Sequence, residues 1–292
     1  MKKTYLSPAK INILLKVTGK KNDGYHEIVT IFQKISLFDK LVFEITDNGK
    51  IKLSCDDPDI PTDEGNLVVK AGLALKRLTS QNLGANVKLK KRIPVAAGLG
   101  GGSSNAATTL VALNSLWNIN APAEKLAKLA LNLGADVPFF LSGPAALACG
   151  IGEKLTPILP EKSVSLLLVN PGFGLSAGDA YKEAHFSFEP FSASQSLIED
   201  IKSGNPAKIS KHMENDLETW ALKKSPKLAL LKQQVESTKP APLKTMVSGS
   251  GPTLLAIYEC HEQAMEAKKN LQNEAPFLAC VKTVTLHNPK PM

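Results

Sequence analysis

The chain has 292 residues, of which 43% are apolar and 21% are charged, and this composition excludes a disordered protein. Its length leaves room for two domains or for one large domain. The formal net charge of +8 favours acidic ligands, either phosphorylated metabolites or nucleic acid, and charge alone does not choose between them.

The beginning of the sequence, MKKTYLSPAKINILLKV, is basic, as a signal peptide is. Lys10, Asn12 and Lys16 interrupt its apolar run, and no small-residue cleavage site follows. No stretch of the sequence approaches the roughly 18 uninterrupted apolar residues that a membrane helix needs. The four cysteines are far apart, which is typical of neither a zinc site nor a disulfide framework. We therefore expect a cytoplasmic protein that has no contact with membranes and keeps reduced, mostly buried thiols.

Alternating apolar residues predict a strand over INILLKV, residues 11–17. One face of this strand takes the apolar residues Ile11, Ile13, Leu15 and Val17. Lys10 and Asn12 then lie side by side on the other face. A turn signal at Asp23-Gly24 and a strand around residues 41–45 follow, and apolar residues at helical spacing predict a helix over residues 66–78. The alternation in VKLKKRIPV predicts a half-exposed strand of an antiparallel or mixed sheet, with Lys88 and Lys90 outward.

The stretch PVAAGLGGGSSNAATTLVAL, residues 94–113, follows that strand. Its apolar periodicity predicts a helix from about residue 104, capped by Ser103 or Ser104. A second helix is predicted over AEKLAKLALNLG, with Gly134 as its C-terminal cap. Asp136 follows directly.

The proline-containing patch TPILPEKS predicts a domain boundary near residue 160, which divides the chain into residues 1–160 and 161–292. The second part starts with a buried strand, VSLLLV. It continues with two helical stretches, PKLALLKQQVEST and HEQAMEAKKNLQN, and with two short strands, TLLAIY and ACVKTVTL.

A strand, a glycine segment and a helix start together form an anion site, because unpaired N–H groups and the positive end of the helix dipole point at the segment. A flexible connector is the alternative. Two common phosphate motifs do not fit: the segment lacks the lysine of a Walker A loop, and GLGGGS lacks the third glycine of a dinucleotide fingerprint.

PVAAGLGGGSSNAATTL resembles the central motif of the GHMP kinases, which holds the phosphates of ATP without a Walker lysine. SPAKINILLKV and VSGSGPTLLAIY match the two other motifs of that superfamily, in order. The segments DGYHEI, LGADVPFFL and NDLE narrow the resemblance to the family that phosphorylates 4-diphosphocytidyl-2-C-methyl-D-erythritol in the non-mevalonate isoprenoid pathway.

The resemblance implies an α+β, two-domain GHMP kinase fold, with a ribosomal S5 domain 2-like N-terminal domain that binds ATP and a ferredoxin-like C-terminal domain. It also implies transfer of the ATP γ-phosphoryl group to the 2-hydroxyl of the acceptor, with Mg²⁺ accompanying the nucleotide and no dedicated protein cage for the metal. The expected partner is this small molecule and not nucleic acid, and the expected state is a monomer or a weak homodimer.

For catalysis, the resemblance makes Asp136 the base that takes the hydroxyl proton and Lys10 its partner, which steadies the attacking oxygen and the phosphoryl group. Residue chemistry alone leaves other roles open. Asp136 precedes Val137-Pro138 and could simply cap the next helix. Lys10 could be a solvated strand lysine.

The resemblance also assigns binding residues. The implied ATP-binding residues are Asn66, Pro94, Gly98, Leu99, Gly100, Gly101, Gly102, Ser103 and Ser104. The implied acceptor-binding residues are Asn12, Tyr25, His26, Tyr181, Gly249, Ser250 and Gly251. Asn66 could instead cap a helix, and Tyr25 and His26 could be ordinary turn residues. Tyr181 is a looser match, because Ala177 and Gly178 stand where the family often has threonine. The NDLE segment, residues 215–218, could be plain helix surface, and it is assigned no catalytic role.

Two rival functions remain. The first is another GHMP kinase, such as homoserine or mevalonate kinase, but this function would leave DGYHEI and the paired pocket aromatics unexplained. A nucleic-acid-binding protein would use KLKKR, but aromatic residues are only 5% of the chain and none is interleaved with these charges for base stacking.

Overall fold

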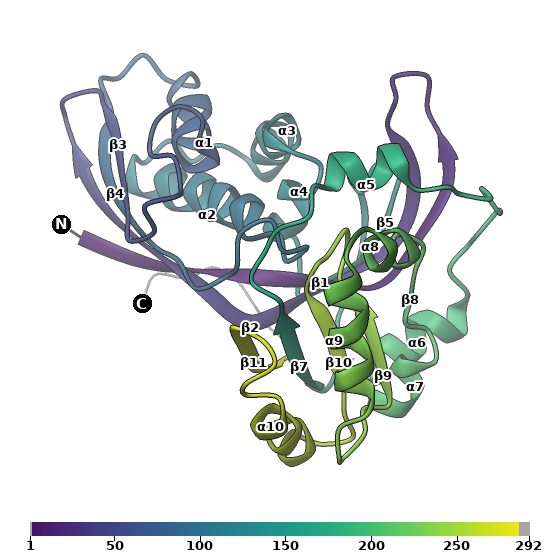
Figure 1. Cartoon of the computed structure of the whole chain (residues 1–292). Helices are drawn as coiled ribbons and strands as arrows, with labels where there is room; N and C mark the ends of the chain where they lie inside the picture. Colours follow the sequence, from purple (N-terminus) through teal and green to yellow (C-terminus); the bar gives the residue numbers. More distant parts are fainter. Residues whose placement is uncertain (1, 286–292) are drawn as a thin grey trace.

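The computed structural model describes residues 2–285 and contains two β-sheets flanked by helices (Figure 1). The first sheet has seven strands in the order β3-β4-β2-β1-β8, with β5 paired to β2 and β6 paired to β5. Its strands are β1 (Lys2–Lys20), β2 (His26–Thr46), β3 (Ile51–Cys55), β4 (Gly84–Lys90), β5 (Ala145–Cys149), β6 (Lys154–Ile158) and β8 (Glu214–Asn215). The β3/β4 and β1/β8 pairs are parallel and the others antiparallel, so the sheet is mixed, as predicted.

Strands β1 and β2 form one long hairpin that crosses the molecule, and its turn projects next to α5 (Figure 1). The pairing register shifts between Asn12 and Leu14. Because of this bulge, the predicted single apolar face is wrong: Ile11 and Ile13 pack in one core, whereas Leu15 and Val17 pack in another. The predicted neighbours on the other face, Lys10 and Asn12, do lie side by side.

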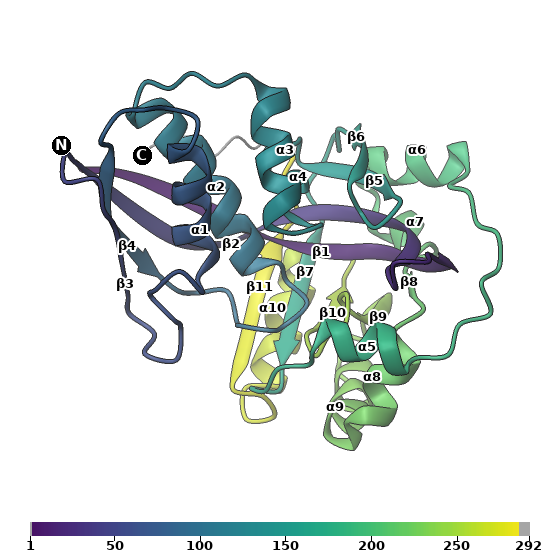
Figure 2. The same ribbon diagram turned by 90° about the horizontal axis from the view of Figure 1, so that it is seen from above.

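Four helices cover one face of the first sheet (Figure 2). They are α1 (Leu67–Lys76), α2 (Gly101–Leu116), α3 (Ala123–Leu133) and α4 (Val137–Leu141). The core between them and the sheet contains Phe43, Leu110 and Phe139, which are fully buried. The α1 and α3 predictions are confirmed, but α2 begins three residues before the predicted start. Gly100, with φ +67°, occupies its N-cap position, so Ser103 and Ser104 lie inside the first turn.

The second sheet has the order β11-β7-β10-β9 and is antiparallel throughout. Its strands are β7 (Ser165–Asn170), β9 (Lys244–Val247), β10 (Leu254–Ile257) and β11 (Phe277–Lys282). Six helices accompany it: α5 (Ala177–Glu183), α6 (Gln195–Ser203), α7 (Pro206–Ser210), α8 (Glu218–Lys224), α9 (Pro226–Glu236) and α10 (His261–Asn270). These strands and helices include every element predicted for the second half.

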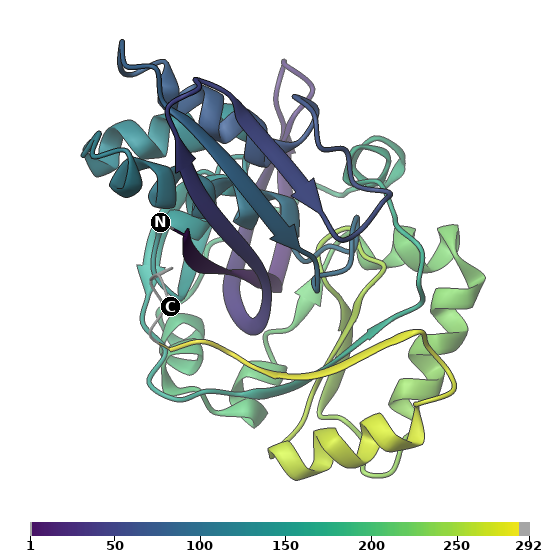
Figure 3. The same ribbon diagram turned by 90° about the vertical axis from the view of Figure 1, so that its left-hand side faces the viewer.

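Strand β7 is buried on both faces, which explains its unbroken apolar sequence. Leu166 and Leu168 face the core shared with the first sheet, whereas Leu167 and Val169 face the core formed with α8, α9 and α10. Figure 3 shows the strands of the first sheet above those of the second. An apolar core that contains Ile11, Leu168 and Leu255 therefore joins the two sheets.

The predicted boundary at residues 160/161 lies between β6 and β7. Strand β8, from the second part, pairs with β1 of the first part, so the first sheet contains strands from both parts. The division into two domains therefore remains a prediction. Within residues 2–285, no helix is long and apolar enough to cross a membrane. The cysteines are free thiols, but the expectation that they are mostly buried is wrong: Cys260 is exposed and the other three are partly exposed.

Candidate active site

The glycine segment packs tightly against two other parts of the chain. Gly98 has φ +74°, and a Cβ atom there would lie 2.0 Å from the carbonyl oxygen of Ser248. Gly100 has φ +67°, and a Cβ atom there would lie 3.0 Å from the Lys10 side chain. The Lys10 N–H also donates to the Leu99 carbonyl (2.9 Å). Glycine is therefore needed both for the backbone conformation and for the close approach.

The first turn of α2 opens into the cavity described below. The first N–H groups of a helix have no partner within the helix, and they carry its partial positive charge. No acidic side chain lies in this turn of α2. Ser103 lines the cavity, but the buried Ser104 hydroxyl accepts a hydrogen bond from the Ser7 hydroxyl (2.7 Å) and is turned away from it. This helix start is suited to bind an anion.

Lys10 and Asp136 form an ion pair in the same cavity, with 3.6 Å between Nζ and Oδ2. Lys10 is buried, which lowers the pKa of its ammonium, while the charge of Asp136 opposes this shift. Its Nζ also donates to Asn12 Oδ1 (2.7 Å) and lies 5.1 Å from the centre of the Phe32 ring. Lys10 is therefore not a solvated strand lysine.

Asp136 occupies the N-cap position of α4, but its side chain makes no capping hydrogen bond. The carboxylate is 36% exposed and lines the cavity. The helix-cap alternative thus accounts for its position in the chain and not for its side chain, which is available to accept a hydrogen bond from a ligand.

A chain of hydrogen bonds orients the Asn12 amide. Its Nδ2 donates to Thr30 Oγ1 (2.8 Å), and the Thr30 hydroxyl donates to the Leu14 carbonyl (2.5 Å). Asn12 Oδ1 consequently faces the Lys10 ammonium. The Ser248 hydroxyl donates to the Gly98 carbonyl (3.2 Å), so the SGSGP turn and the glycine segment are held against each other.

Aromatic rings cluster near the hairpin turn, and Tyr25, His26 and Tyr181 of this cluster line the cavity. The rings of His26 and Tyr181 are stacked with 5.5 Å between centroids, and Phe186 and Phe188 lie 5.3 and 6.2 Å from His26. Burial, with a smaller contribution from the charge of Lys20, lowers the pKa of His26. Burial also raises the pKa of Tyr181, and the charge of Asp136 adds to this. Both rings are therefore neutral near pH 7, while Tyr25 is 58% exposed at the rim.

These parts line one cavity of about 1100 Å³. Most of the residues predicted for the site line this cavity, including members of both the ATP-binding and the acceptor-binding sets. They are Lys10, Asn12, Tyr25, His26, Asn66, Pro94, Gly98, Gly100, Gly101, Gly102, Ser103, Asp136, Tyr181, Gly249 and Ser250. Leu99, Ser104 and Gly251 are not among its lining residues and lie behind the wall.

The Asn66 side chain makes two hydrogen bonds at the start of α1. Its Oδ1 accepts from the Val68 N–H (2.8 Å), and its Nδ2 donates to the Pro61 carbonyl (2.7 Å). The helix-cap alternative is therefore confirmed. Contact with adenine stays a prediction for this residue, which also lines the cavity.

The NDLE segment is not plain helix surface. Asn215 lies in β8, and its Nδ2 donates to the carbonyls of Val247 and Gly249 (2.8 Å each). Glu218 Oε1 accepts from the Val247 N–H (3.0 Å). These bonds hold the turn that brings Gly249 to the cavity. One sequence feature could have indicated this role: the segment is short and polar, and it lacks the apolar periodicity of a surface helix.

The described residues 2–285 contain no group of three or more His, Cys, Asp and Glu side chains placed to hold a metal ion. Oxygen donors that line the cavity include the Ser103 hydroxyl and the Asp136 carboxylate.

Comparison with known proteins agrees with this geometry. Residues 66–144 match the GHMP kinases N terminal domain. The chain is 41% identical over 277 residues to the 4-diphosphocytidyl-2-C-methyl-D-erythritol kinase of Thermoanaerobacter pseudethanolicus, with 94% of each chain covered. It is 40% identical over 264 residues to the kinase of the same name from Pelotomaculum thermopropionicum, covering 90% of this chain and 91% of that one.

Among solved structures, the chain is similar to a crystal structure of 4-(cytidine 5'-diphospho)-2C-methyl-D-erythritol kinase, with a TM-score of 0.81, 31% identity, and 96% and 98% of the two chains covered. L. major mevalonate kinase, with a TM-score of 0.72 and 17% identity over 97% of this chain and 96% of that one, shares the fold. The predicted α+β GHMP kinase fold is confirmed. On these identities and coverages, the chain belongs to the 4-diphosphocytidyl-2-C-methyl-D-erythritol kinase family of the GHMP kinases.

Proposed function

We propose that this protein transfers the γ-phosphoryl group of ATP to the 2-hydroxyl of 4-diphosphocytidyl-2-C-methyl-D-erythritol, giving the 2-phosphate and ADP. The observation that carries the proposal is the pair formed by Lys10 and Asp136, 3.6 Å apart, in the cavity that also contains the helix start of α2 and the aromatic rings. Family membership at about 40% identity supports the same reaction.

In the proposed reaction, Asp136 accepts the proton of the 2-hydroxyl while the hydroxyl oxygen forms a bond to the γ-phosphorus. The bond from that phosphorus to the β–γ bridging oxygen breaks, and ADP leaves with the electron pair. Lys10 holds its ammonium beside both the carboxylate and the transferring group. Phosphoryl transfer is accelerated mainly by such positioning and charge compensation, for which a buried cation is well suited.

The nucleotide phosphates would lie at the first turn of α2, against the backbone of Gly98 to Gly102. Hard cations prefer oxygen ligands, and Mg²⁺ keeps several waters when it binds with nucleotide phosphates. The Ser103 hydroxyl and the Asp136 carboxylate are oxygen donors of this kind, so the residues present fit the ion. When bound, Mg²⁺ would neutralise part of the charge of the phosphates.

The acceptor would be bound through its cytosine ring. Tyr25, His26 and Tyr181 offer flat surfaces for stacking, and a neutral His26 has one donor and one acceptor nitrogen for a base edge. Gly249 and Ser250, in the turn held by Asn215, would lie near the acceptor phosphates. All these groups come from one chain, which is compatible with the expected monomer or weak homodimer. The proposed compartment is the cytoplasm.

The test is ADP release from ATP and Mg²⁺ in the presence of different acceptors. We expect release with 4-diphosphocytidyl-2-C-methyl-D-erythritol and only background release without it. Turnover of homoserine or mevalonate in its place would contradict the proposal and favour another GHMP kinase.

The nucleic-acid alternative has its own test. Lys88 and Lys90 are exposed on β4, whereas the stacked rings of His26 and Tyr181 lie at the cavity. Titration of single- and double-stranded oligonucleotides at increasing salt should detect only weak binding that salt removes. Tight, salt-resistant binding would make nucleic acid a partner.

A further inference from the structure

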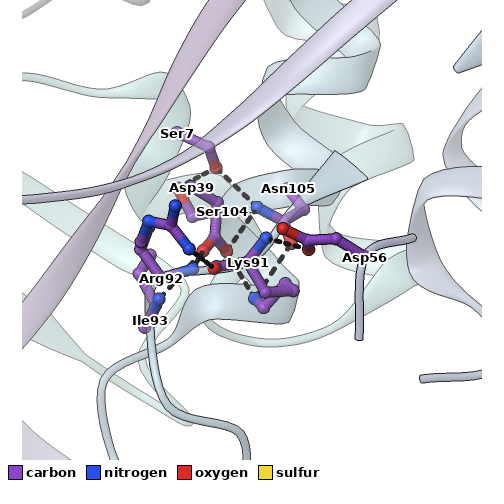
Figure 4. A network of polar contacts seen from close by, with 8 residues as sticks. All are labelled: Ser7, Asp39, Asp56, Lys91, Arg92, Ile93, Ser104 and Asn105. Atoms are coloured by element: carbon purple, nitrogen blue, oxygen red, sulfur yellow. Dashed lines mark hydrogen bonds and ion pairs between the residues drawn. The ribbon is translucent and has the colours of Figure 1, made fainter. Parts of the chain in front are cut away.

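Asp39, in β2, is a completely buried carboxylate that does not line the cavity. Its Oδ1 accepts from the backbone N–H groups of Arg92 (2.7 Å) and Ile93 (2.9 Å). Its Oδ2 accepts from Asn105 Nδ2 (3.0 Å) and forms a close ion pair with the Lys91 ammonium (Figure 4). A buried charge is costly unless it is paired and hydrogen-bonded in this way, so Asp39 depends on all four partners.

The four partners lie on the two sides of the glycine segment. Arg92 and Ile93 lead into it, and Asn105 follows it in α2. One carboxylate thus closes the loop of chain that contains residues 94–104. The closure extends to β1, because Asn105 Nδ2 also donates to the Ser7 hydroxyl (2.9 Å), three residues before Lys10.

The Lys91 side chain is only 9% exposed, yet it lines the cavity together with Gly101 and Asn105. A Cβ atom built on Gly101 would lie 3.2 Å from Lys91 Nζ, so the ammonium is at the first turn of α2. Asn105 Oδ1 lies 3.4 Å from the same nitrogen. Asp39 therefore fixes a positive charge beside the N–H groups that form the anion site.

We propose that Asp39 is a positioning residue for the nucleotide: it closes the glycine segment at both sides and holds the Lys91 ammonium toward the phosphates. This inference rests on the proposed function. It predicts a change in ATP affinity opposite in direction to the change that simple electrostatics predicts. Removing a negative charge near an anion site should tighten anion binding, whereas removing a positioning group should weaken it.

The experiment compares the direct binding of ATP to the wild type, to Asp39→Asn and to Asp56→Asn, by titration calorimetry without acceptor. Asp56 is the matched control: it is exposed, it carries the same charge, and its carboxylate accepts from the backbone N–H of the same lysine (2.8 Å). We expect the Kd for ATP to rise at least about tenfold in Asp39→Asn, the scale of loss when an orienting group is removed, and to stay within about twofold in Asp56→Asn.

Turnover separates positioning from general damage. In Asp39→Asn the KM for ATP should rise while the KM for the acceptor stays near the wild-type value. Unchanged or tighter ATP binding, or an equal rise of both KM values, would overturn the inference. Failure of the wild type to phosphorylate the acceptor, with ATP binding intact, would sink the proposed substrate and leave the Asp39 test standing, whereas failure to bind ATP would overturn both.

If Asp39→Asn does not fold, Ser7→Ala takes its place. This change removes the hydrogen bond that Ser7 accepts from Asn105 and the one that it donates to Ser104, and it leaves the ion pair intact. A rise of about threefold in the Kd for ATP is expected, which is the loss of part of one hydrogen bond. An unchanged Kd would overturn the inference.

Discussion

Backbone groups line one end of the cavity, and side chains line the other. At the end proposed for the nucleotide, the wall is backbone: glycines, N–H groups and a helix start, supported by buried polar contacts. At the end proposed for the acceptor, the wall is side chains, among them the stacked rings of His26 from the β1/β2 hairpin and Tyr181 from α5. Backbone recognises phosphate by shape and partial charge, whereas rings recognise a base by stacking and edge contacts. Substitutions at the two ends should therefore affect different ligands.

The largest effect is expected where the two ends meet. Asp136→Asn keeps the shape of the side chain and removes its ability to take a proton, so kcat should fall by roughly 10³-fold or more, counting the loss of base catalysis and of charge balance with Lys10. Since the carboxylate makes no capping hydrogen bond, the variant should still fold, although loss of the ion pair with the buried Lys10 should lower its melting temperature modestly. Near-normal turnover in a steady-state assay would remove Asp136 from the role of base.

At the nucleotide end, Gly98→Ala should disturb the backbone itself. The added Cβ would meet the Ser248 carbonyl, and the left-handed φ alone costs about 1–3 kcal/mol for a residue with a side chain. We expect a lower free energy of unfolding, measured by urea denaturation, and weaker ATP binding. Gly102→Ala is the matched control for stability, because its nearest neighbour would be 3.7 Å away and its φ is not left-handed. Equal destabilisation by both changes would show that tight packing at Gly98 is not the cause.

At the acceptor end, Tyr181→Leu should remove a stacking surface. Base stacking on an aromatic ring contributes about 1–3 kcal/mol, so the KM for the acceptor should rise roughly 10- to 100-fold with little change in the KM for ATP. Phe188→Leu is the control, since Phe188 belongs to the same ring cluster but does not line the cavity. A rise in the KM for ATP instead would contradict the division of the cavity into two ends.

The smallest effect on turnover is expected at Lys34, behind the cavity. Its buried ammonium donates to the carbonyls of Phe140 (3.0 Å) and Ser142 (2.8 Å), at the C-terminal end of the helix that carries Asp136, and burial lowers its pKa to about 7. The unfolded chain, with an ordinary lysine pKa of about 10.4, binds more protons than the folded one between these two values. The contribution of Lys34 to stability therefore rises with pH across that window.

Lys34→Met should remove this dependence. Urea denaturation at pH 7 and at pH 9.5 should show the wild type gaining stability relative to the variant at the higher pH. The same difference at both pH values would mean that the pKa of Lys34 is not lowered in the folded state.

The nucleotide end was the easier one to predict, because its residues are contiguous and glycine leaves a direct signal in the sequence. The helix start was still wrong by three residues, because Gly100 in the left-handed conformation takes the N-cap position that a serine was expected to fill. Pairing of Lys10 with Asn12 followed from strand alternation.

The buried supports of the site could not be predicted. Asp39 lies in LFDK, where a charged residue normally lies on the surface, and its burial depends on partners more than 50 residues away. Asn215 holds the turn at Gly249 across 34 residues. Such long-range hydrogen bonds leave no periodicity in the sequence, so only the three-dimensional structure reveals them.

The most direct test of the two-ended cavity is a crystal structure of the protein with a non-hydrolysable ATP analogue and the acceptor bound together. We expect the phosphates against residues 98–103, the cytosine ring beside Tyr181, and the 2-hydroxyl oxygen about 2.6–3.2 Å from an Asp136 carboxylate oxygen. Phosphates bound away from the glycine segment, or a 2-hydroxyl out of reach of Asp136, would contradict it.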